Sequence, residues 1–326
     1  MARREISDIL ATESWSQKQQ RMLASGGVPT KSGNDNNTVM GWDWFRGDYL
    51  NYFPTAANLA EPAALYDYFL DGLVPEQPFI TKEQNVLAFG SCFAEYIRLY
   101  LQEHGYAAYT AHRGTRVVPV IHYGEGLNNT FTLLQQFEWV WGNKQISEGL
   151  WIDKDKKYII PTEEGRLATK EIFDRTDVFI LTLGLSEIWY DKVTGEVFWR
   201  GITKDMYDPK RHGFRVSTVE ENTQNLYKIY DFIKRNRPDA KIIVTLSPVP
   251  LYATFRDIPC TAASTVSKAI LRVAADNLYT KFPDVYYWPS YEIVNLLGRY
   301  DADNRHVSEE TRTVILNAFH KYFLCA

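Results

Sequence analysis

The chain changes periodicity within a few residues, and this change limits the folds open to it. Residues 86–89 form a short apolar run between polar residues, which is typical of a buried parallel strand. The apolar residues that follow recur at the spacing of one helix face: Phe93, Ile97, Tyr100 and Leu101. A strand that leads directly into a helix predicts the first unit of an α/β fold.

The turn between this strand and its helix consists of Gly90, Ser91 and Cys92. Gly90 can adopt backbone angles that other residues resist, so the chain can turn sharply at the end of the strand. The helix N-terminus presents backbone N–H groups and a positive dipole to whatever side chain lies there. A hydroxyl or thiol at this place is a candidate nucleophile, and the alternative interpretation is a simple helix cap.

Four more strands are predicted, and helical patterns separate them. The predicted strands cover residues 116–122, 177–183, 241–246 and 285–288. Five strands that alternate with helices predict a mostly parallel sheet with helices on both faces. Between residues 189 and 217, the pair Thr194 and Gly195 predicts a small inserted hairpin.

Ligands of such sheets bind at the carboxyl ends of the strands, and several candidate residues fall there. Gly124 and Gly126 lie in a loop after the second predicted strand, where backbone N–H groups are candidates for an oxyanion hole. An ordinary turn with an asparagine cap is the alternative for this loop. Ser186 and Glu187 follow the third predicted strand.

A second candidate element lies before the last predicted helix, where Asp303 precedes His306 by three residues. A carboxylate at this spacing on a tight loop can fix the tautomer of an imidazole and stabilise its cation. The pair is what a nucleophile needs as base and orienting group. Local capping is the alternative for an isolated loop pair, and the nucleophile turn favours the catalytic interpretation.

Composition excludes several classes of function. The 326 residues carry a net charge of −4, which predicts binding neither to nucleic acid nor to an anionic membrane. The six histidines and three cysteines lack the spacing of metal ligands, and no phosphate-binding glycine motif occurs. We therefore expect no metal and no cofactor. The absence of a signal sequence and of long apolar stretches predicts a cytoplasmic location, and nothing indicates an oligomeric state.

The N-terminal quarter differs from the rest of the chain. Residues 1–40 are polar and predict a mobile segment. Residues 41–80 are rich in aromatic side chains without periodicity, which predicts an irregular extension packed on the core. The catalytic domain is then expected over residues 81–326.

The motifs together resemble those of a known family. Gly90-Ser91-Cys92-Phe93-Ala94 spells the name of the GSCFA family, a branch of the SGNH-hydrolase superfamily. Further segments that are similar cover residues 181–189, 245–251 and 289–292 and the block of Asp303 and His306. The resemblance implies a flavodoxin-like three-layer α/β/α sandwich. It also implies an esterase, a lipase, an acetyl-sugar hydrolase or an acyltransferase that acts on polysaccharides.

Two departures from the superfamily pattern concern the site. The superfamily's first block is Gly-Asp-Ser. Aligning Gly90 with its glycine puts Ser91 at the aspartate and Cys92 at the nucleophilic serine. Cys92 is therefore the first candidate for the nucleophile, and Ser91 is the second. A thiol at a helix N-terminus beside a histidine is chemically suited to this role. The block Gly-x-Asn-Asp matches Gly184 to Glu187, so Ser186 replaces the oxyanion asparagine. Candidates to replace its amide are Asn128, Asn129 and the backbone N–H groups of Cys92, Gly124 or Gly126.

The sequence therefore predicts an enzyme that forms a covalent acyl intermediate on Cys92, or on Ser91. His306 would act as base and then as acid, and Asp303 would orient it. The expected substrate is a small-molecule or oligosaccharide ester, most simply an acylated carbohydrate, and the reaction is hydrolysis or acyl transfer. The alternative is a non-catalytic module that binds a glycan or an acyl group in the same pocket.

Overall fold

The computed structural model describes residues 51, 53–109, 118–122, 126–153 and 155–325. The chain divides into two compact units, Met1–Leu73 and Val74–Ala326. In the first unit the described residues form α3 (Ala56–Leu59) and a π-helical turn, η1 (Tyr66–Leu70). The predicted mobile segment 1–40 lies outside the described residues, as do five of the ten aromatic residues of segment 41–80. The three predicted segment boundaries remain predictions.

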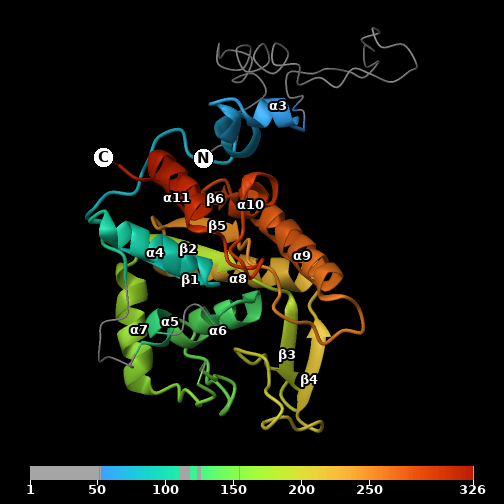
Figure 1. Ribbon diagram of the computed structural model, residues 1–326. Coiled ribbons are helices and arrows are strands. Elements are labelled where there is room, and N and C mark those ends of the chain that lie inside the picture. The colour runs from blue at the N-terminus through green and yellow to red at the C-terminus, as the bar shows by residue number, and fades with distance from the viewer. Residues whose placement is uncertain (1–50, 52, 110–117, 123–125, 154, 326) are drawn as a thin grey trace. The chain divides into compact units, whose positions relative to one another are not determined.

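The second unit contains a parallel sheet of four strands (Figure 1). In spatial order the strands are β1 (Val86–Gly90), β2 (Val178–Leu183), β5 (Lys241–Leu246) and β6 (Val285–Trp288). Gly90 pairs with Thr182, and Thr182 pairs with Thr245 on the next strand. Strands β1 and β2 are buried along their whole length, which explains their continuous apolar sequences. The predicted α/β class with a mostly parallel sheet is confirmed.

The second predicted strand, residues 116–122, is wrong for the part that the structure describes. Pro119–His122 forms a turn of helix, α5. Proline suits the first turn of a helix, because its φ is already helical and its missing N–H is not needed there. The place beside β1 is taken instead by a single parallel bridge between Val86 and Ala108.

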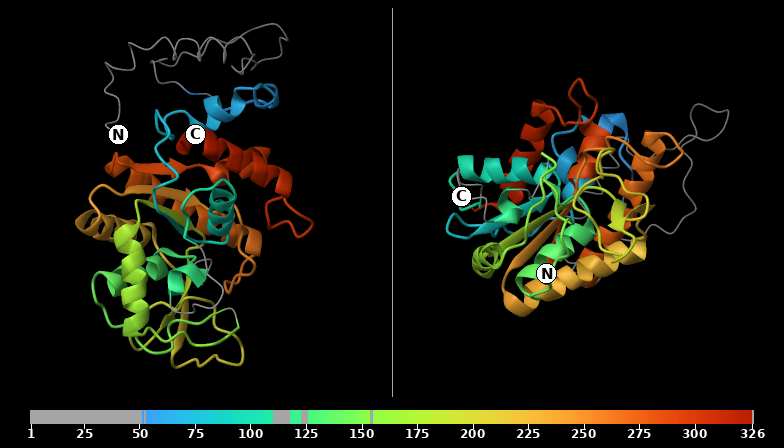
Figure 2. Two further views of the ribbon diagram at one scale, coloured as in Figure 1. Left: turned by 90° about the vertical axis from the view of Figure 1, so that its left-hand side faces the viewer. Right: turned by 90° about the horizontal axis from the view of Figure 1, so that it is seen from below.

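Helices cover both faces of the sheet, giving the three layers that Figures 1 and 2 show. Tyr287 and Trp288 at the end of β6 point in opposite directions. Tyr287 stacks on Tyr279 of α9 (Cys260–Lys281), with 5.5 Å between ring centroids, whereas Trp288 contacts Phe319 of α11 (Glu309–Phe323) at 5.4 Å. The remaining helices of these layers are α4 (Phe93–Glu103), α6 (Thr130–Val140), α7 (Glu163–Arg175), α8 (Val219–Asn236) and α10 (Ser290–Leu297).

The core between β1 and the layer of α6 and α7 is aromatic. Phe89 of β1 lies 5.9 Å from Phe137 of α6 and 6.1 Å from Phe173 of α7, measured between ring centroids. Phe179 of β2 joins the same cluster. This packing fixes the strand that precedes Gly90, and with it the position of the turn.

An inserted β-structure follows β2, but its strand pairing differs from the predicted hairpin. Strand β3 (Glu187–Asp191) pairs antiparallel with β4 (His212–Val216). The predicted turn at Thr194 and Gly195 does reverse the chain, and Tyr190 and Val197 form a single bridge beyond it. The chain leaves the ladder there because Phe198 and Trp199 are buried in the core, where Trp199 stacks on Trp151 at 4.5 Å.

Side-chain caps begin two of these helices. Thr218 caps α8 in a capping box with Glu221, and Ser308 caps α11 through a bond from the Thr311 N–H. Among the described residues, no helix has the length and apolar character needed to span a membrane.

Candidate active site

The turn after β1 requires glycine at its first position, residue 90. Gly90 has a φ of +132°, and a Cβ there would lie 2.1 Å from the carbonyl oxygen of Thr182. Any other residue would therefore combine strain with a backbone clash. The Ser91 N–H donates to the same carbonyl at 3.0 Å and to the Thr182 hydroxyl at 2.5 Å. The turn is thus held against the neighbouring strand by its backbone.

The two candidate nucleophiles differ in their surroundings. Ser91 is only 3% exposed, and its hydroxyl accepts the Phe93 N–H at 3.3 Å. Cys92 is half-buried at the N-cap of α4, and its side chain does not cap the helix. Cys92 is not in a disulfide. Of the two residues, Cys92 is the more exposed.

The segment after β2 packs against the start of α6. The N–H groups of Gly184 and Leu185 both donate to the Asn128 carbonyl, at 2.8 and 3.0 Å. A Cβ on Gly184 would lie 2.9 Å from that oxygen, so glycine permits the close approach. Gly184 thus joins two loops at the carboxyl edge of the sheet.

Ser186 lies behind this edge and is fully buried. Its N–H donates to the Ser267 hydroxyl at 2.8 Å, and its carbonyl accepts both the N–H and the hydroxyl of Ser217 at 2.8 Å. The Ser186 hydroxyl has no hydrogen-bond partner among the described residues. The structure gives Ser186 a packing role, and no surface at which it could meet a substrate.

Asn129 caps α6, because its side-chain oxygen accepts the Thr132 N–H at 3.0 Å. That bond leaves the amide nitrogen of Asn129 as a donor for a ligand. Asn128 is half-buried beside it. Gly126 is buried and lies against the Arg200 guanidinium, whereas Gly124 lies outside the described residues.

Glu187 opens β3 and is mostly buried. The Thr254 hydroxyl lies 2.8 and 3.0 Å from its two carboxylate oxygens. Glu187 therefore braces the loop that contains Thr254.

Asp303 and His306 form the predicted pair. The Nδ1 atom of His306 lies 2.5 Å from one carboxylate oxygen of Asp303, and the other oxygen accepts the N–H groups of Arg305 and His306 at 2.9 and 3.0 Å. These backbone bonds first, and the imidazole second, lower the pKa of Asp303 to about 2. The carboxylate thus stays ionised at neutral pH, and it favours the tautomer of His306 that has its proton on Nδ1.

Contacts on either side place this loop at the carboxyl edge of the sheet. The Tyr300 hydroxyl donates to the Pro248 carbonyl, just after β5, at 3.4 Å. Arg312, one turn into α11, lies 4.5 Å from the ring centre of Tyr96, one turn into α4. The helix that follows His306 and the helix that follows Cys92 therefore contact each other in their first turns.

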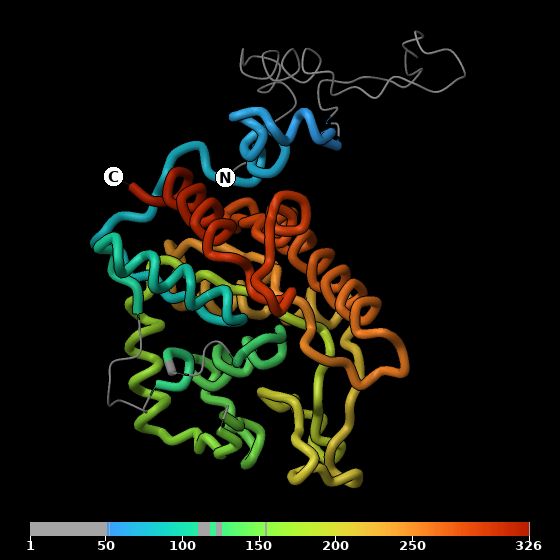
Figure 3. The backbone as a smooth tube through the Cα atoms, in the orientation of Figure 1, coloured from blue at the N-terminus to red at the C-terminus, as the bar shows by residue number. Residues whose placement is uncertain are grey.

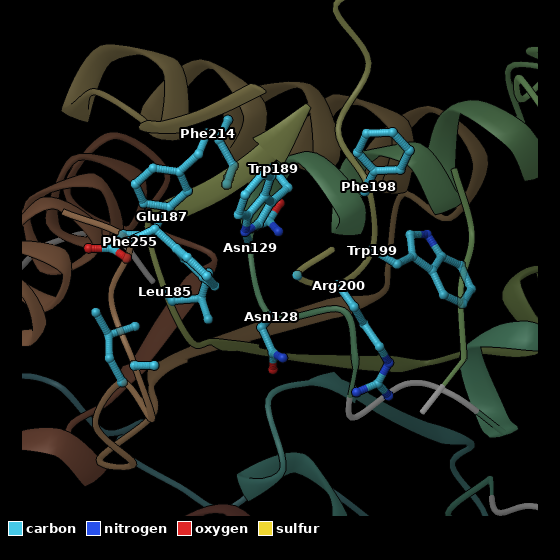
Figure 4. Close-up of a pocket in the computed structure, with 14 residues that line it drawn as sticks. Asn128, Asn129, Leu185, Glu187, Trp189, Phe198, Trp199, Arg200, Phe214 and Phe255 are labelled. Atoms are coloured by element: carbon cyan, nitrogen blue, oxygen red, sulfur yellow. The ribbon is translucent and has the colours of Figure 1, made fainter. Parts of the chain in front are cut away.

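A pocket of about 200 Å³ opens beside the segment after β2 (Figure 4). Five of its fourteen lining residues are aromatic, and Figure 4 shows Asn128 and Arg200 together on one side. The lining residues that the figure labels are Asn128, Asn129, Leu185, Glu187, Trp189, Phe198, Trp199, Arg200, Phe214 and Phe255. Neither this pocket nor Arg200 was predicted from the sequence, because the lining comes from five separate segments.

Sequence reasoning also missed Lys268, on the inner face of α9. Its side chain is only 3% exposed, and Nζ donates to the carbonyls of Gly184 and Ser247 at 2.8 and 2.7 Å. A signal was present, because Ser264, Lys268 and Leu271 follow one another at helical spacing. That spacing places the lysine on the buried face.

Clusters of side chains suited to hold a metal ion do not occur among the described residues. A family model with the description GSCFA family matches residues 85–319. The chain belongs to the GSCFA family. The match spans all four strands of the parallel sheet, the turn of Gly90, Ser91 and Cys92, and the loop of Asp303 and His306.

Solved structures similar to this GSCFA protein include a proposed platelet activating factor from Streptococcus pneumonia, with 19% identity and a TM-score of 0.37 over 74% of this chain and 84% of that chain. A proposed GDSL-like lipase from Parabacteroides merdae has 16% identity and a TM-score of 0.39, and the match covers 76% of this chain and 98% of the lipase chain. A carbohydrate esterase family 2 enzyme with a carbohydrate-binding domain, from Corynascus thermopiles, has 13% identity and a TM-score of 0.34. This match covers 76% of this chain and 68% of the esterase chain. The comparison with curated proteins found no match.

Proposed function

We propose that this GSCFA protein is an ester hydrolase or acyltransferase that forms a thioester on Cys92. His306 first accepts the proton of Cys92. The thiolate attacks the ester carbonyl carbon, the C–O bond breaks, and the alcohol leaves with that proton. Water or an acceptor alcohol then gives a proton to His306 and attacks the thioester, the C–S bond breaks, and the proton passes from His306 to the sulfur. Asp303 orients His306 throughout.

The observation that carries the proposal is the contrast between the two side chains of the turn. Ser91 is buried and accepts a backbone N–H, whereas Cys92 is half-buried at the start of α4. The position at a helix N-terminus favours a thiolate. We therefore assign the nucleophile to Cys92 and a structural role to Ser91.

The Asp303 and His306 geometry supports the acid–base part of the proposal. The carboxylate contacts Nδ1 of the imidazole, which leaves Nε2 for proton transfer. The contact between Arg312 and Tyr96 ties the helix after His306 to the helix after Cys92. We infer that Nε2 of His306 faces the thiol.

The oxyanion site is the least conventional part of the proposal. Since Asn129 lines the pocket and Ser186 does not, we assign the donor role to the side-chain amide of Asn129, with Asn128 beside it. Loss of a single oxyanion donor costs on the order of 3 kcal/mol of barrier in other acyl-transfer enzymes. We infer a similar cost for Asn129→Ala.

The pocket supports a sugar ester as the substrate. Aromatic faces suit the apolar faces of sugar rings, and the polar groups at the pocket can bind hydroxyl groups. Trp189 and Phe255 contact each other at 4.9 Å, and Phe255 contacts Phe214 at 5.3 Å. Arg200 lines the pocket as well, and its buried Nε has no hydrogen-bond partner among the described residues.

Acyl transfer to the protein can be tested by intact-mass spectrometry after brief incubation with p-nitrophenyl acetate. We expect one acetyl adduct on the wild type and on Ser91→Ala, none on Cys92→Ala, and slower formation on His306→Ala. An adduct that is lost in Ser91→Ala and kept in Cys92→Ala would make the protein a serine esterase. A protein that forms no adduct and no product, yet binds sugars, would be the non-catalytic module instead.

The substrate assignment needs its own comparison of two esters, an acetylated methyl glycoside and vinyl acetate. We expect Phe255→Ala to raise KM for the sugar ester about fivefold and to leave vinyl acetate unchanged, because only the sugar needs the aromatic wall. Tyr158→Ala is a matched control, since Tyr158 is similarly exposed and lies outside the pocket. Equal effects of Phe255→Ala on both esters would remove the sugar from the proposal.

A further inference from the structure

The loop between β5 and α9, residues 247–259, carries two exposed aromatic side chains. Tyr252 is 82% exposed, and Phe255 is 58% exposed. Isolated exposed apolar residues are ordinary, whereas exposed apolar surface gathered in one place is a common mark of a binding site. What the two rings contact therefore decides whether they belong to one site.

The ring of Phe255 belongs to the pocket (Figure 4). Its centroid lies 4.9 Å from that of Trp189 and 5.3 Å from that of Phe214, and both of these residues line the pocket too. Although it makes these contacts, Phe255 stays more than half exposed. Phe255 is therefore an open wall of the pocket that a ligand can reach.

The ring of Tyr252 lies against the loop of the proposed base. The guanidinium carbon of Arg305 is 4.8 Å from the centre of the Tyr252 ring, which is a cation–π distance. Arg305 lies between Asp303 and His306 in the sequence, and its N–H donates to the Asp303 carboxylate at 2.9 Å. Figure 3 shows the loop after β5, in orange, beside the red loop before α11. One loop thus contacts the pocket through Phe255 and the proposed base through Tyr252.

Hydrogen bonds hold this loop in place around the two rings. Thr254, which lies between them in sequence, has its hydroxyl 2.8 and 3.0 Å from the carboxylate oxygens of Glu187. The same hydroxyl accepts the Arg256 N–H at 3.2 Å. Before the rings, the Leu251 N–H donates to the Ser264 hydroxyl at 3.3 Å. A loop that is already held loses little conformational freedom when a ligand binds, so the rings form a surface prepared for binding.

The spacing of the two rings suits one ligand longer than a single sugar. Residues three apart in a chain have Cα atoms at most about 11 Å from each other. A short oligosaccharide can therefore contact both rings, and the apolar faces of its sugar rings suit aromatic side chains.

We propose that Tyr252 forms a second sugar-binding site, next to the loop of Asp303 and His306, and that the substrate is an oligosaccharide ester. One sugar unit would stack on Phe255 in the pocket, and a neighbouring unit would stack on Tyr252. The inference rests on the proposed function for the kind of substrate. It adds a binding residue outside the pocket and a preference for longer sugars.

The first test measures binding without any ester. Isothermal titration calorimetry compares cellotriose, xylotriose and tri-N-acetylchitotriose with their monosaccharides. We expect at least one trisaccharide to bind the wild type about tenfold more tightly than its monosaccharide, and Tyr252→Ala to remove most of that gain. Tyr252→Phe should keep the gain, as should Tyr158→Ala, which removes an exposed tyrosine outside the pocket. The proposal is overturned if no trisaccharide binds more tightly than its monosaccharide, or if Tyr252→Ala keeps the gain.

The second test separates sugar binding from support of the Asp303 and His306 loop. If Tyr252 only held Arg305, Tyr252→Ala would lower kcat for every ester. We expect it instead to raise KM for the acetylated trisaccharide about tenfold and to leave vinyl acetate hydrolysis unchanged. A loss of kcat on vinyl acetate with an unchanged KM for the trisaccharide ester would overturn the second site. Because the calorimetry uses no ester, the site can fail while the acyl adduct on Cys92 forms, or hold while it does not.

Discussion

The two halves of the candidate site are held in different ways. The turn of Gly90, Ser91 and Cys92 is fixed by bonds to the next strand, through the carbonyl and hydroxyl of Thr182. The loop of Asp303 and His306 is fixed by bonds within itself, and Asp303 is exposed. The proposed nucleophile therefore depends on the whole sheet, whereas the proposed base depends on a few residues of loop. Substitutions that disturb the backbone of the first half should cost stability, and the loss of Asp303 in the second half should cost rate.

The largest effect on stability is expected for Gly90→Ala. The added Cβ would meet the Thr182 carbonyl oxygen at 2.1 Å in a backbone conformation with a φ of +132°. We expect a loss of about 3 kcal/mol or more in the free energy of unfolding, measured by urea denaturation. Gly105→Ala is the matched control at the other end of α4, because its φ is +78° but no atom lies within 4 Å of the added Cβ. It should lose only about 1 kcal/mol. Equal losses would mean that the turn does not depend on β2.

The next effect, on rate, is expected for Asp303→Asn. The amide cannot hold the imidazole as a carboxylate does, so kcat/KM should fall on the order of 100-fold. The ordinary pKa of aspartate is about 3.9 and that of Asp303 is about 2, so its stabilising effect is complete above pH 4 and is lost as the pH falls to 2.

Thermal unfolding tests how the stabilisation by Asp303 depends on pH. Any difference in melting temperature between the wild type and Asp303→Asn should be present at pH 6 and absent by pH 2. Because the group is exposed, that difference should be small while the loss of rate is large. A large loss of stability with an unchanged rate would show that the carboxylate serves the loop and not His306.

The same contrast explains what the sequence could predict. Asp303 and His306 are three residues apart, and the pair was predicted because its geometry is local. Strands β1, β2, β5 and β6 are buried apolar runs, which periodicity recognises. Strand β4 was missed because its sequence mixes charged, polar and apolar residues without alternation. Lys268 and the aromatic pocket were missed because they depend on contacts between segments that are far apart in sequence.

The smallest effects on stability are expected for two serines behind the sheet edge, Ser217 and Ser186. Ser217 donates its hydroxyl to the Ser186 carbonyl and accepts from the Asn222 amide, both at 2.8 Å, and it is buried. Ser217→Ala should therefore lose about 1–2 kcal/mol in urea unfolding. Ser186→Ala should change stability by less than about 0.5 kcal/mol, because its own hydroxyl is buried and has no hydrogen-bond partner among the described residues. Its rate should also be unchanged. A Ser186→Ala variant that folds normally but loses activity would return the oxyanion role to Ser186, and would show that the edge after β2 opens during the reaction.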